Sequence, residues 1–201
     1  MKPSDGSGEG ESLARMEHRV RLGSWSPDGE TLVIEVVNPT TLEDIWILPR
    51  EGEPSPWLAT PFRERRPELS PDGRWLIYLS DESGRTEVYL QPYPGPGQRV
   101  KVSTAGGLEP SWSRDGHEIF YRGRGDLFAV SFDAATEPPV GRPSRLIDGG
   151  PYRASGGTSR YYDVSPDGGH FAMLPLGIRS LRELRVVLNW FEELKERVPT
   201  E

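Results

Sequence analysis

Short apolar runs separated by turn residues dominate the hydrophobic pattern of this chain. The clearest runs lie in ETLVIEVV, RWLIYLS, HEIFYR and GHFAML, and glycine, proline or polar residues bound each of them. Runs of this length predict β-strands, and because polar residues interrupt them so little, we expect strands that are buried on both faces. The pattern therefore predicts an all-β protein whose sheets are covered on both sides.

The same four-residue turn precedes each of these runs. SPDG begins at Ser26, Ser70 and Ser165, and the variant SRDG begins at Ser113. In a type I turn the serine bonds to the turn backbone, the proline presets the second residue, and the glycine accepts a positive φ. Because the residues recur before every run, we interpret them as hairpin turns and not as catalytic aspartates.

The turn glycines repeat at a regular interval. Gly29, Gly73, Gly116 and Gly168 are separated by 44, 43 and 52 residues, and a period of about 40 to 50 residues is typical of β-propeller blades. Two further strand-like segments follow each of the first three turns, so each unit predicts four antiparallel strands. We therefore predict a β-propeller of four four-stranded blades, either a closed ring or an arc of a larger propeller.

The repeat also resembles a known family. The stretch SWSPDGETLVIEVVNPTTLEDIWILP is similar to the Pro-Asp-type, WD40-like repeat of TolB-like β-propellers, and to the propeller regions at the C-termini of bacterial serine/threonine kinases. The final VVLNWFEELKERVP is similar to the end of many of those chains. The resemblance implies a non-catalytic module for protein interaction or ligand sensing, often extracytoplasmic, with the sensor portion of a larger kinase-type signalling protein as an alternative.

The repeats predict one propeller domain over residues 1–201. Its expected parts are blades at about 16–60, 61–104, 105–149 and 158–190, and a short helix at 189–198. Because the last unit lacks a fourth strand, residues 10–15 are expected to supply its outer strand and so to close a ring. The alternative is an arc of a larger propeller whose other blades lie outside this chain.

Charge and composition argue against several functions. The chain has 24 Lys and Arg against 31 Asp and Glu, a net charge of −7, which disfavours a nucleic-acid partner. It has no cysteine, so disulfides and Cys-based metal sites are excluded. We expect no membrane insertion, because no apolar run reaches the roughly 18 residues that a span needs. The chain as written is expected in the cytoplasm, and as part of a longer chain outside it or in the periplasm.

Motifs for catalysis are absent from the sequence. It contains no nucleophile elbow, no glycine-rich phosphate loop and no kinase H-R-D or D-F-G motif. The three histidines have no partner at metal-ligand spacing. We therefore expect no enzymatic activity, no cofactor and no metal. The alternative is a propeller hydrolase, or the accessory propeller of a prolyl-oligopeptidase-like peptidase.

The loops that lead from one blade into the next are the expected binding surface, because loops on a rigid scaffold usually carry function. They combine arginines, acids and tyrosines, a composition that would recruit an acidic protein or peptide. The alternative is that these charges are solvated and pair with one another. The candidate residues are Arg63, Arg65, Arg66, Glu68, Glu109, Arg160, Tyr161, Tyr162 and Asp163.

Overall fold

Four antiparallel sheets form the protein. The computed structural model describes residues 9–10, 12–95, 97–150, 152, 159–175 and 185–187. Within them, three sheets have four strands and the last has three, and strands that are consecutive in the sequence are neighbours in each sheet. We call the sheets blades 1 to 4 in chain order. The helix predicted at 189–198 lies outside the described residues.

The strands of each blade run from the innermost to the outermost in chain order. Their bounds are β1 (Arg19–Trp25), β2 (Thr31–Asn38), β3 (Leu42–Pro49) and β4 (Ser55–Leu58) in blade 1; β5 (Glu64–Leu69), β6 (Trp75–Ser80), β7 (Glu87–Pro92) and β8 (Val100–Lys101) in blade 2; β9 (Leu108–Trp112), β10 (Glu118–Gly123), β11 (Asp126–Ser131) and β12 (Ser144–Ile147) in blade 3; and β13 (Tyr162–Val164), β14 (Phe171–Met173) and β15 (Arg185–Val187) in blade 4.

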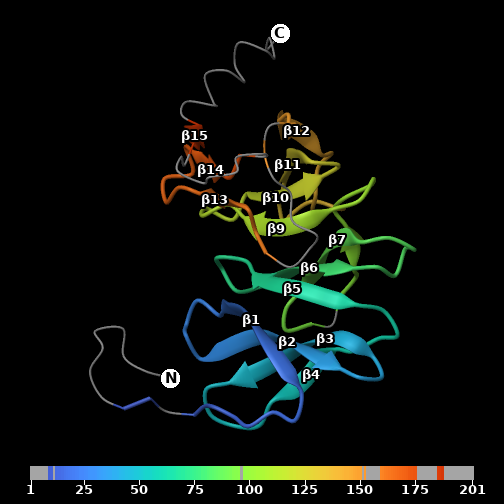
Figure 1. The fold of residues 1–201 in the computed structure, drawn as a ribbon, viewed down its shortest axis with the longest axis vertical. Helices are drawn as coiled ribbons and strands as arrows, with labels where there is room; N and C mark the ends of the chain where they lie inside the picture. The colour runs from blue at the N-terminus through green and yellow to red at the C-terminus, as the bar shows by residue number, and fades with distance from the viewer. Residues whose placement is uncertain are drawn as a thin grey trace.

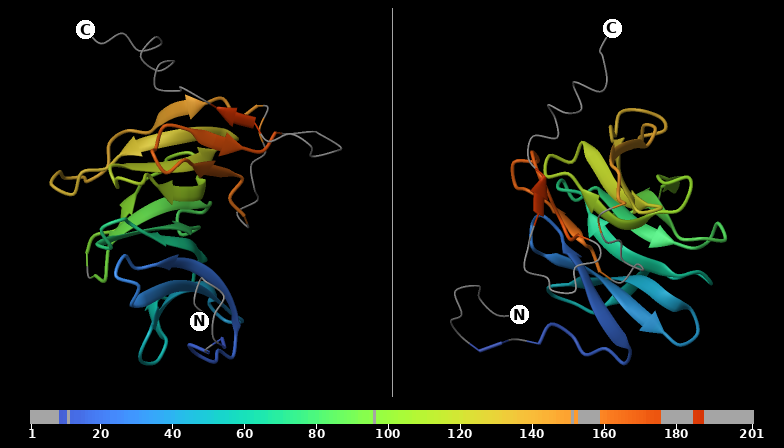
Figure 2. Two further views of the ribbon diagram at one scale, coloured as in Figure 1. Left: turned by 90° about the vertical axis from the view of Figure 1, so that its left-hand side faces the viewer. Right: turned by 45° about the horizontal axis from the view of Figure 1, so that its top comes forward.

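The blades stack face to face into an arc. Figure 1 shows β1, β5 and β9 one above another and β13 beside β9, and the left view of Figure 2 has blade 1 at the bottom and blades 3 and 4 at the top. The predicted fold class, an all-β propeller with antiparallel blades, is confirmed. Closure of a ring stays a prediction.

The four Ser-x-Asp-Gly segments form the same hydrogen-bonded hairpin turn. In blade 3, the amide of Gly116 donates to the carbonyl of Ser113 at 3.1 Å, and the Ser113 hydroxyl donates to the carboxylate of Asp115 at 2.6 Å. That hydroxyl also accepts the amide of Glu118 at 2.9 Å, while Asp115 accepts the amide of His117 at 3.1 Å. The other three turns repeat these bonds, and all four glycines have φ between 71° and 75°. Each polar group of the motif thus has a structural partner.

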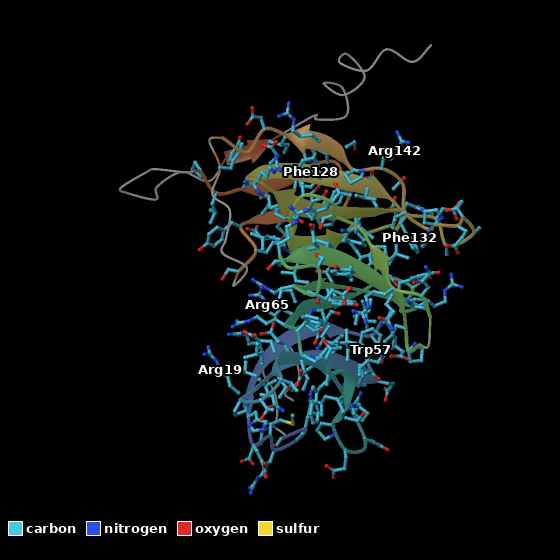
Figure 3. The ribbon with its side chains drawn as sticks, turned by 90° about the vertical axis from the view of Figure 1, so that its right-hand side faces the viewer. Arg19, Trp57, Arg65, Phe128, Phe132 and Arg142 are labelled. Atoms are coloured by element: carbon cyan, nitrogen blue, oxygen red, sulfur yellow. The ribbon has the colours of Figure 1, made fainter. Side chains whose placement is uncertain are left out.

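The hydrophobic core lies between the blades, because side chains on the second strand of each blade alternate between two interfaces. Counted from the turn glycine, the third and fifth residues face the preceding blade and the fourth faces the following blade. Leu76 and Tyr78 pack on blade 1, whereas Ile77 packs on blade 3. The equivalent residues toward the preceding blade are Ile119, Tyr121, Phe171 and Met173, and Phe120 faces the following one. Side chains fill the spaces between the ribbons of neighbouring blades (Figure 3).

Residues 12–16 lie against blade 1. Leu13, Ala14 and Met16 pack on the face of blade 1 that points away from blade 2, and residues 12–16 form no strand. This differs from the expectation that residues 10–15 complete blade 4. The physical reason is that the apolar side chains of this segment are covered by blade 1, where they pack with Leu32, Ile34 and Leu48.

Candidate functional site

A groove runs along the innermost strands of the four blades. It has a volume of about 550 Å³ and crosses β1, β5, β9 and β13. We call it the central groove; the side chains that matter for its chemistry are Trp25, Arg66, Glu68, Glu109, Arg160 and Asp163. Charged and apolar side chains meet in this groove, and both kinds of contact are used in the recognition of peptides.

Irregular strand pairing gives the groove its shape. The pairing of β1 with β2 shifts between Leu22 and Trp25, and that of β5 with β6 shifts between Arg65 and Glu68. Close to these shifts, Arg66 has a φ of 58°, and Glu109 at the equivalent position of β9 has a φ of 54°. This left-handed conformation costs a residue with a Cβ atom about 1 kcal/mol or more. Contacts around the two side chains must therefore hold them in place.

Alternating charges cross the blades beside the groove. Arg21 pairs with Glu35, and the Glu35 carboxylate also accepts the amide of Arg66 at 3.2 Å. Loss of water lowers the pKa of Arg66, and the negative charges of Glu35 and Glu109 oppose that shift. Burial likewise lowers the pKa of Arg122, against the opposing charge of Glu109. Since Glu35, Glu109 and Arg122 are all buried, we interpret this charge line as part of the architecture.

A second ion pair is open to the groove. Arg160 donates to Glu68 Oε2 at 3.1 Å and to Ser111 Oγ at 2.6 Å, and it lies 3.5 Å from Asp163 Oδ1. Glu68 also accepts the amide of Trp112 at 3.0 Å. Desolvation raises the pKa of Glu68, and the positive charge of Arg160 opposes this. Because the side chains of Arg160 and Glu68 are 33% and 28% exposed, a ligand in the groove can reach both.

Five of the nine candidate residues line the central groove. They are Arg66, Glu68, Glu109, Arg160 and Asp163. Two of the others pair elsewhere: Arg63 lies 3.4 Å from Glu43 and 4.0 Å from Asp81, and Arg65 donates to Thr86 Oγ1 at 3.2 Å. Figure 3 shows Arg65 toward the same edge of the stack as Arg19, away from Trp57 and Phe132.

The two candidate tyrosines support the groove from behind. Tyr162 is buried, and its hydroxyl donates to the carbonyl of Glu109 at 2.8 Å. Burial raises the pKa of Tyr162 well above its usual value, so the phenol stays protonated. The amide of Tyr161 donates to the Glu109 carboxylate at 2.8 Å. Both residues therefore join blade 4 to blade 3.

The groove also contains residues that the sequence analysis did not single out. Ser111 and Trp112 supply hydrogen bonds to Glu68, and Trp25 and Arg114 add apolar and positive surface. The signal that could have identified them is their position beside the repeated turn, on the innermost strand of each blade.

Positive and negative charges in the groove are more evenly balanced than the sequence predicts. Its lining includes the arginines Arg66, Arg114 and Arg160 and the acids Glu68, Glu109 and Asp163. For Arg63 and Arg160 the pairing alternative holds, since both form ion pairs with acids of the same surface. The groove therefore offers both signs of charge to a ligand.

In the part of the chain that the structure describes, no group of three or more His, Cys, Asp or Glu residues could hold a metal ion. Among the described residues there is no helix long and apolar enough to cross a membrane.

Comparisons with known proteins agree on the fold. No protein-family model matches the chain. The uncharacterized protein Atu1656 of Agrobacterium fabrum is 29% identical over 143 residues, which are 66% of this chain and 47% of that protein. The crystal structure of TolB from Acinetobacter baumannii matches with a TM-score of 0.68 and 16% identity, over 94% of this chain and 45% of that one.

A structure of puromycin hydrolase (an S511A mutant complexed with PGG) also matches, with a TM-score of 0.62 and 18% identity, over 89% of this chain and 28% of that one. The chain therefore has the TolB-like β-propeller fold. It spans about half the length of Atu1656 and of the A. baumannii TolB.

Proposed function

We propose that this chain is a non-catalytic interaction module that binds a segment of a partner protein in its central groove. The observation that carries the proposal is the Arg160–Glu68 ion pair, which is held by Ser111 and remains accessible. Its geometry is fixed by backbone and side-chain contacts from three blades, so a ligand would meet a preorganised site.

The composition of the groove favours a peptide over a small anion. A single anion would use the positive groups alone, whereas a peptide offers carboxylates, amides and apolar side chains together. Trp25 is 42% exposed at the groove, and exposed aromatic side chains are frequent anchors of protein partners. The match to TolB supports an interaction role at the level of the fold.

A display library of random peptides, panned against the purified chain, tests this proposal. We expect the selected peptides to bind Arg160→Ala about tenfold more weakly, because a charge-assisted hydrogen bond to the ligand is lost. Arg142→Ala is the matched control, since Arg142 is exposed and is not one of the residues that line the groove. Binding that falls equally in both variants, or a library that yields no binder sensitive to Arg160→Ala, would contradict the proposal.

The match to puromycin hydrolase favours one alternative, that this propeller is the accessory part of a larger enzyme. An enzyme that uses the groove itself would depend on the Glu68 carboxylate, the one partly desolvated acid beside Arg160. Turnover of fluorogenic peptide or glycoside substrates by this chain, abolished in Glu68→Gln, would overturn the non-catalytic proposal.

A further inference from the structure

One of the four hairpin turns differs from the others at its second residue. Blades 1, 2 and 4 have Pro27, Pro71 and Pro166 at this position, whereas blade 3 has Arg114. The turn of blade 3 makes the same hydrogen bonds as the other three, so the arginine is not needed to form it. The turn alone therefore does not explain an arginine at this position.

The prolines also contact the next turn along the stack. A Cβ atom at Gly73 would lie 2.9 Å from Cδ of Pro27, and the proline of blade 2 makes the equivalent contact with the turn glycine of blade 3 at 3.4 Å. Arg114 occupies the position from which the turn of blade 4 would be contacted. Yet a Cβ atom at Gly168 would meet no described atom within 4 Å. Arg114 therefore does not take over the packing role of the prolines.

The charge of Arg114 belongs to the central groove. Arg114 is exposed and lines the groove. Burial raises the pKa of Glu68, and the positive charges of Arg160 and Arg114 both oppose that shift. Glu68 is already bonded to Arg160 at 3.1 Å, whereas Arg114 has no ion pair and no side-chain hydrogen bond within the part of the chain that the structure describes. The guanidinium of Arg114 is thus open to a ligand.

The other arginines of the groove are matched with acids of the protein. Arg160 lies 3.1 Å from Glu68 and 3.5 Å from Asp163, and the negative charge of Glu35 acts on Arg66. The arginine of the blade 3 turn is the positive group that still lacks such a partner among the described residues. Because complementary charges govern the specificity of an interface, a negative group of the ligand is expected at this point of the groove.

An apolar surface lies in the same groove, on blade 1. Trp25 and Leu22 line the groove and are 42% and 78% exposed. The residues equivalent to Trp25 in blades 2 and 3 are Leu69 and Trp112, which are only 6% and 5% exposed. The groove volume of about 550 Å³ suits a few side chains of an extended segment and is too small for a folded domain.

We infer that Arg114 selects the segment bound in the central groove by pairing with an aspartate or glutamate side chain, while an apolar side chain of the same segment covers Trp25. This selection rests on the proposed function, because it concerns which peptides the groove binds. The groove crosses the innermost strands of all four blades, so a segment can continue beyond it at both ends. For this reason we assign the negative group to an acidic side chain and not to a free C-terminus.

Arg114→Pro is the variant that isolates this role, since it gives blade 3 the turn sequence of the other blades and removes the charge. None of the hydrogen bonds described for this turn uses the amide of Arg114. We therefore expect Arg114→Pro to melt at the same temperature as the wild type or higher, because proline at a compatible turn position stabilises a fold. Arg74→Gln is the matched control, since Arg74 is an exposed arginine beside the equivalent turn of blade 2 but does not line the groove.

A library of random short peptides, displayed inside a carrier protein and panned in parallel against the wild type and Arg114→Pro, is the probe. We expect enrichment of Asp and Glu on the wild type and none on the variant. Synthetic copies of the wild-type binders should bind Arg114→Pro about fivefold more weakly, the strength of an exposed ion pair. Changing the acid of the peptide to its amide should cost the same factor, and the two changes together should cost no more than either alone. Arg74→Gln should leave the Kd unchanged.

A charge swap separates recognition from a structural effect. Arg114→Glu is expected to prefer a peptide in which lysine replaces the acid, a reversal that a purely structural role would not produce. Peptides that are sensitive to Arg160→Ala but bind the wild type and Arg114→Pro equally would overturn this inference and leave the proposed function standing. Equal weakening in Arg74→Gln, or binding that requires a free C-terminus, would also overturn it. A library without any binder would overturn both.

Discussion

At the scale of single residues, the Ser-x-Asp-Gly turn explains its own recurrence. In each blade the serine hydroxyl donates to the aspartate and accepts an amide from the start of the next strand. Proline is dispensable at the second position, since Arg114 makes the same turn in blade 3. These residues satisfy backbone groups at the point where β-strands reverse, and this role is structural.

The turn aspartates make stability depend on acid pH. Hydrogen bonds from Ser113 and from the amide of His117 lower the pKa of Asp115 below its usual 3.8. A carboxylate with a lowered folded-state pKa stabilises the folded protein above its unfolded pKa, and this contribution is lost as the pH falls through the folded value. We expect Asp115→Asn to destabilise the protein at pH 7 by up to about 1 kcal/mol, since the group is exposed, and to destabilise it less at pH 3, which is below the unfolded pKa.

Urea unfolding of the wild type and Asp115→Asn at the two pH values provides the measurement. Glu137→Gln removes an exposed acid of the same blade and is the control for loss of charge alone. A difference between Asp115→Asn and the wild type that stays the same at both pH values would show that the turn carboxylate does not carry this dependence.

At the scale of elements, buried charges connect the innermost strands. Glu109 of β9 accepts the amide of Tyr161 before β13, and its charge acts on Arg66 of β5 and on Arg122 of β10. Its positive φ and that of Arg66 are tolerated because these contacts hold the strand ends together. The charge line thus joins blades 2, 3 and 4 at the edge of the groove.

Removing the negative charge of Glu109 should therefore be costly. Glu109→Gln keeps the size of the side chain but leaves Arg66 and Arg122 without their shared opposite charge. We expect a loss of about 3 kcal/mol in the free energy of unfolding, because the charge of the buried Arg122 then loses the compensating charge of Glu109. Urea denaturation measures it, with the exposed Glu51→Gln as the control; losses of equal size in the two variants would refute the role of the charge line.

At the scale of the whole molecule, stability is shared between neighbouring blades. The largest core cluster joins Ile77, Leu79 and Val88 of blade 2 to Ile119 and Val130 of blade 3. Neither sheet could cover these side chains alone. Unfolding of one blade therefore exposes the core of the next, and the blades are expected to unfold together.

A truncation in that interface tests the shared core. Ile77→Ala removes a side chain with no solvent exposure, and we expect it to lower the free energy of unfolding by about 2 to 5 kcal/mol. Leu22→Ala is the control, because Leu22 is 78% exposed and should change stability by no more than about 0.5 kcal/mol. Thermal and urea unfolding followed by circular dichroism decide between shared and separate cores: a second, unshifted transition in Ile77→Ala would indicate blades that unfold independently.

The sequence by itself determined the turns, the strands and their repetition. These features are local, since Ser113, Asp115 and Gly116 bond to one another and to residues at most five positions away. The alternation of Leu76, Ile77 and Tyr78 between two interfaces also follows from strand geometry.

The tertiary structure alone decided which charges meet. Arg160 and Glu68 are 92 residues apart and pair because the innermost strands of different blades are brought side by side. For the same reason, the sequence predicts Arg63 and Arg65 as binding residues, although in the structure they contact other side chains. Arg63 pairs with Glu43, and Arg65 donates to the hydroxyl of Thr86. The spacing of the turns and apolar runs along the chain determines the strands of each blade. The angle and the order in which the blades pack determine which residues line the groove.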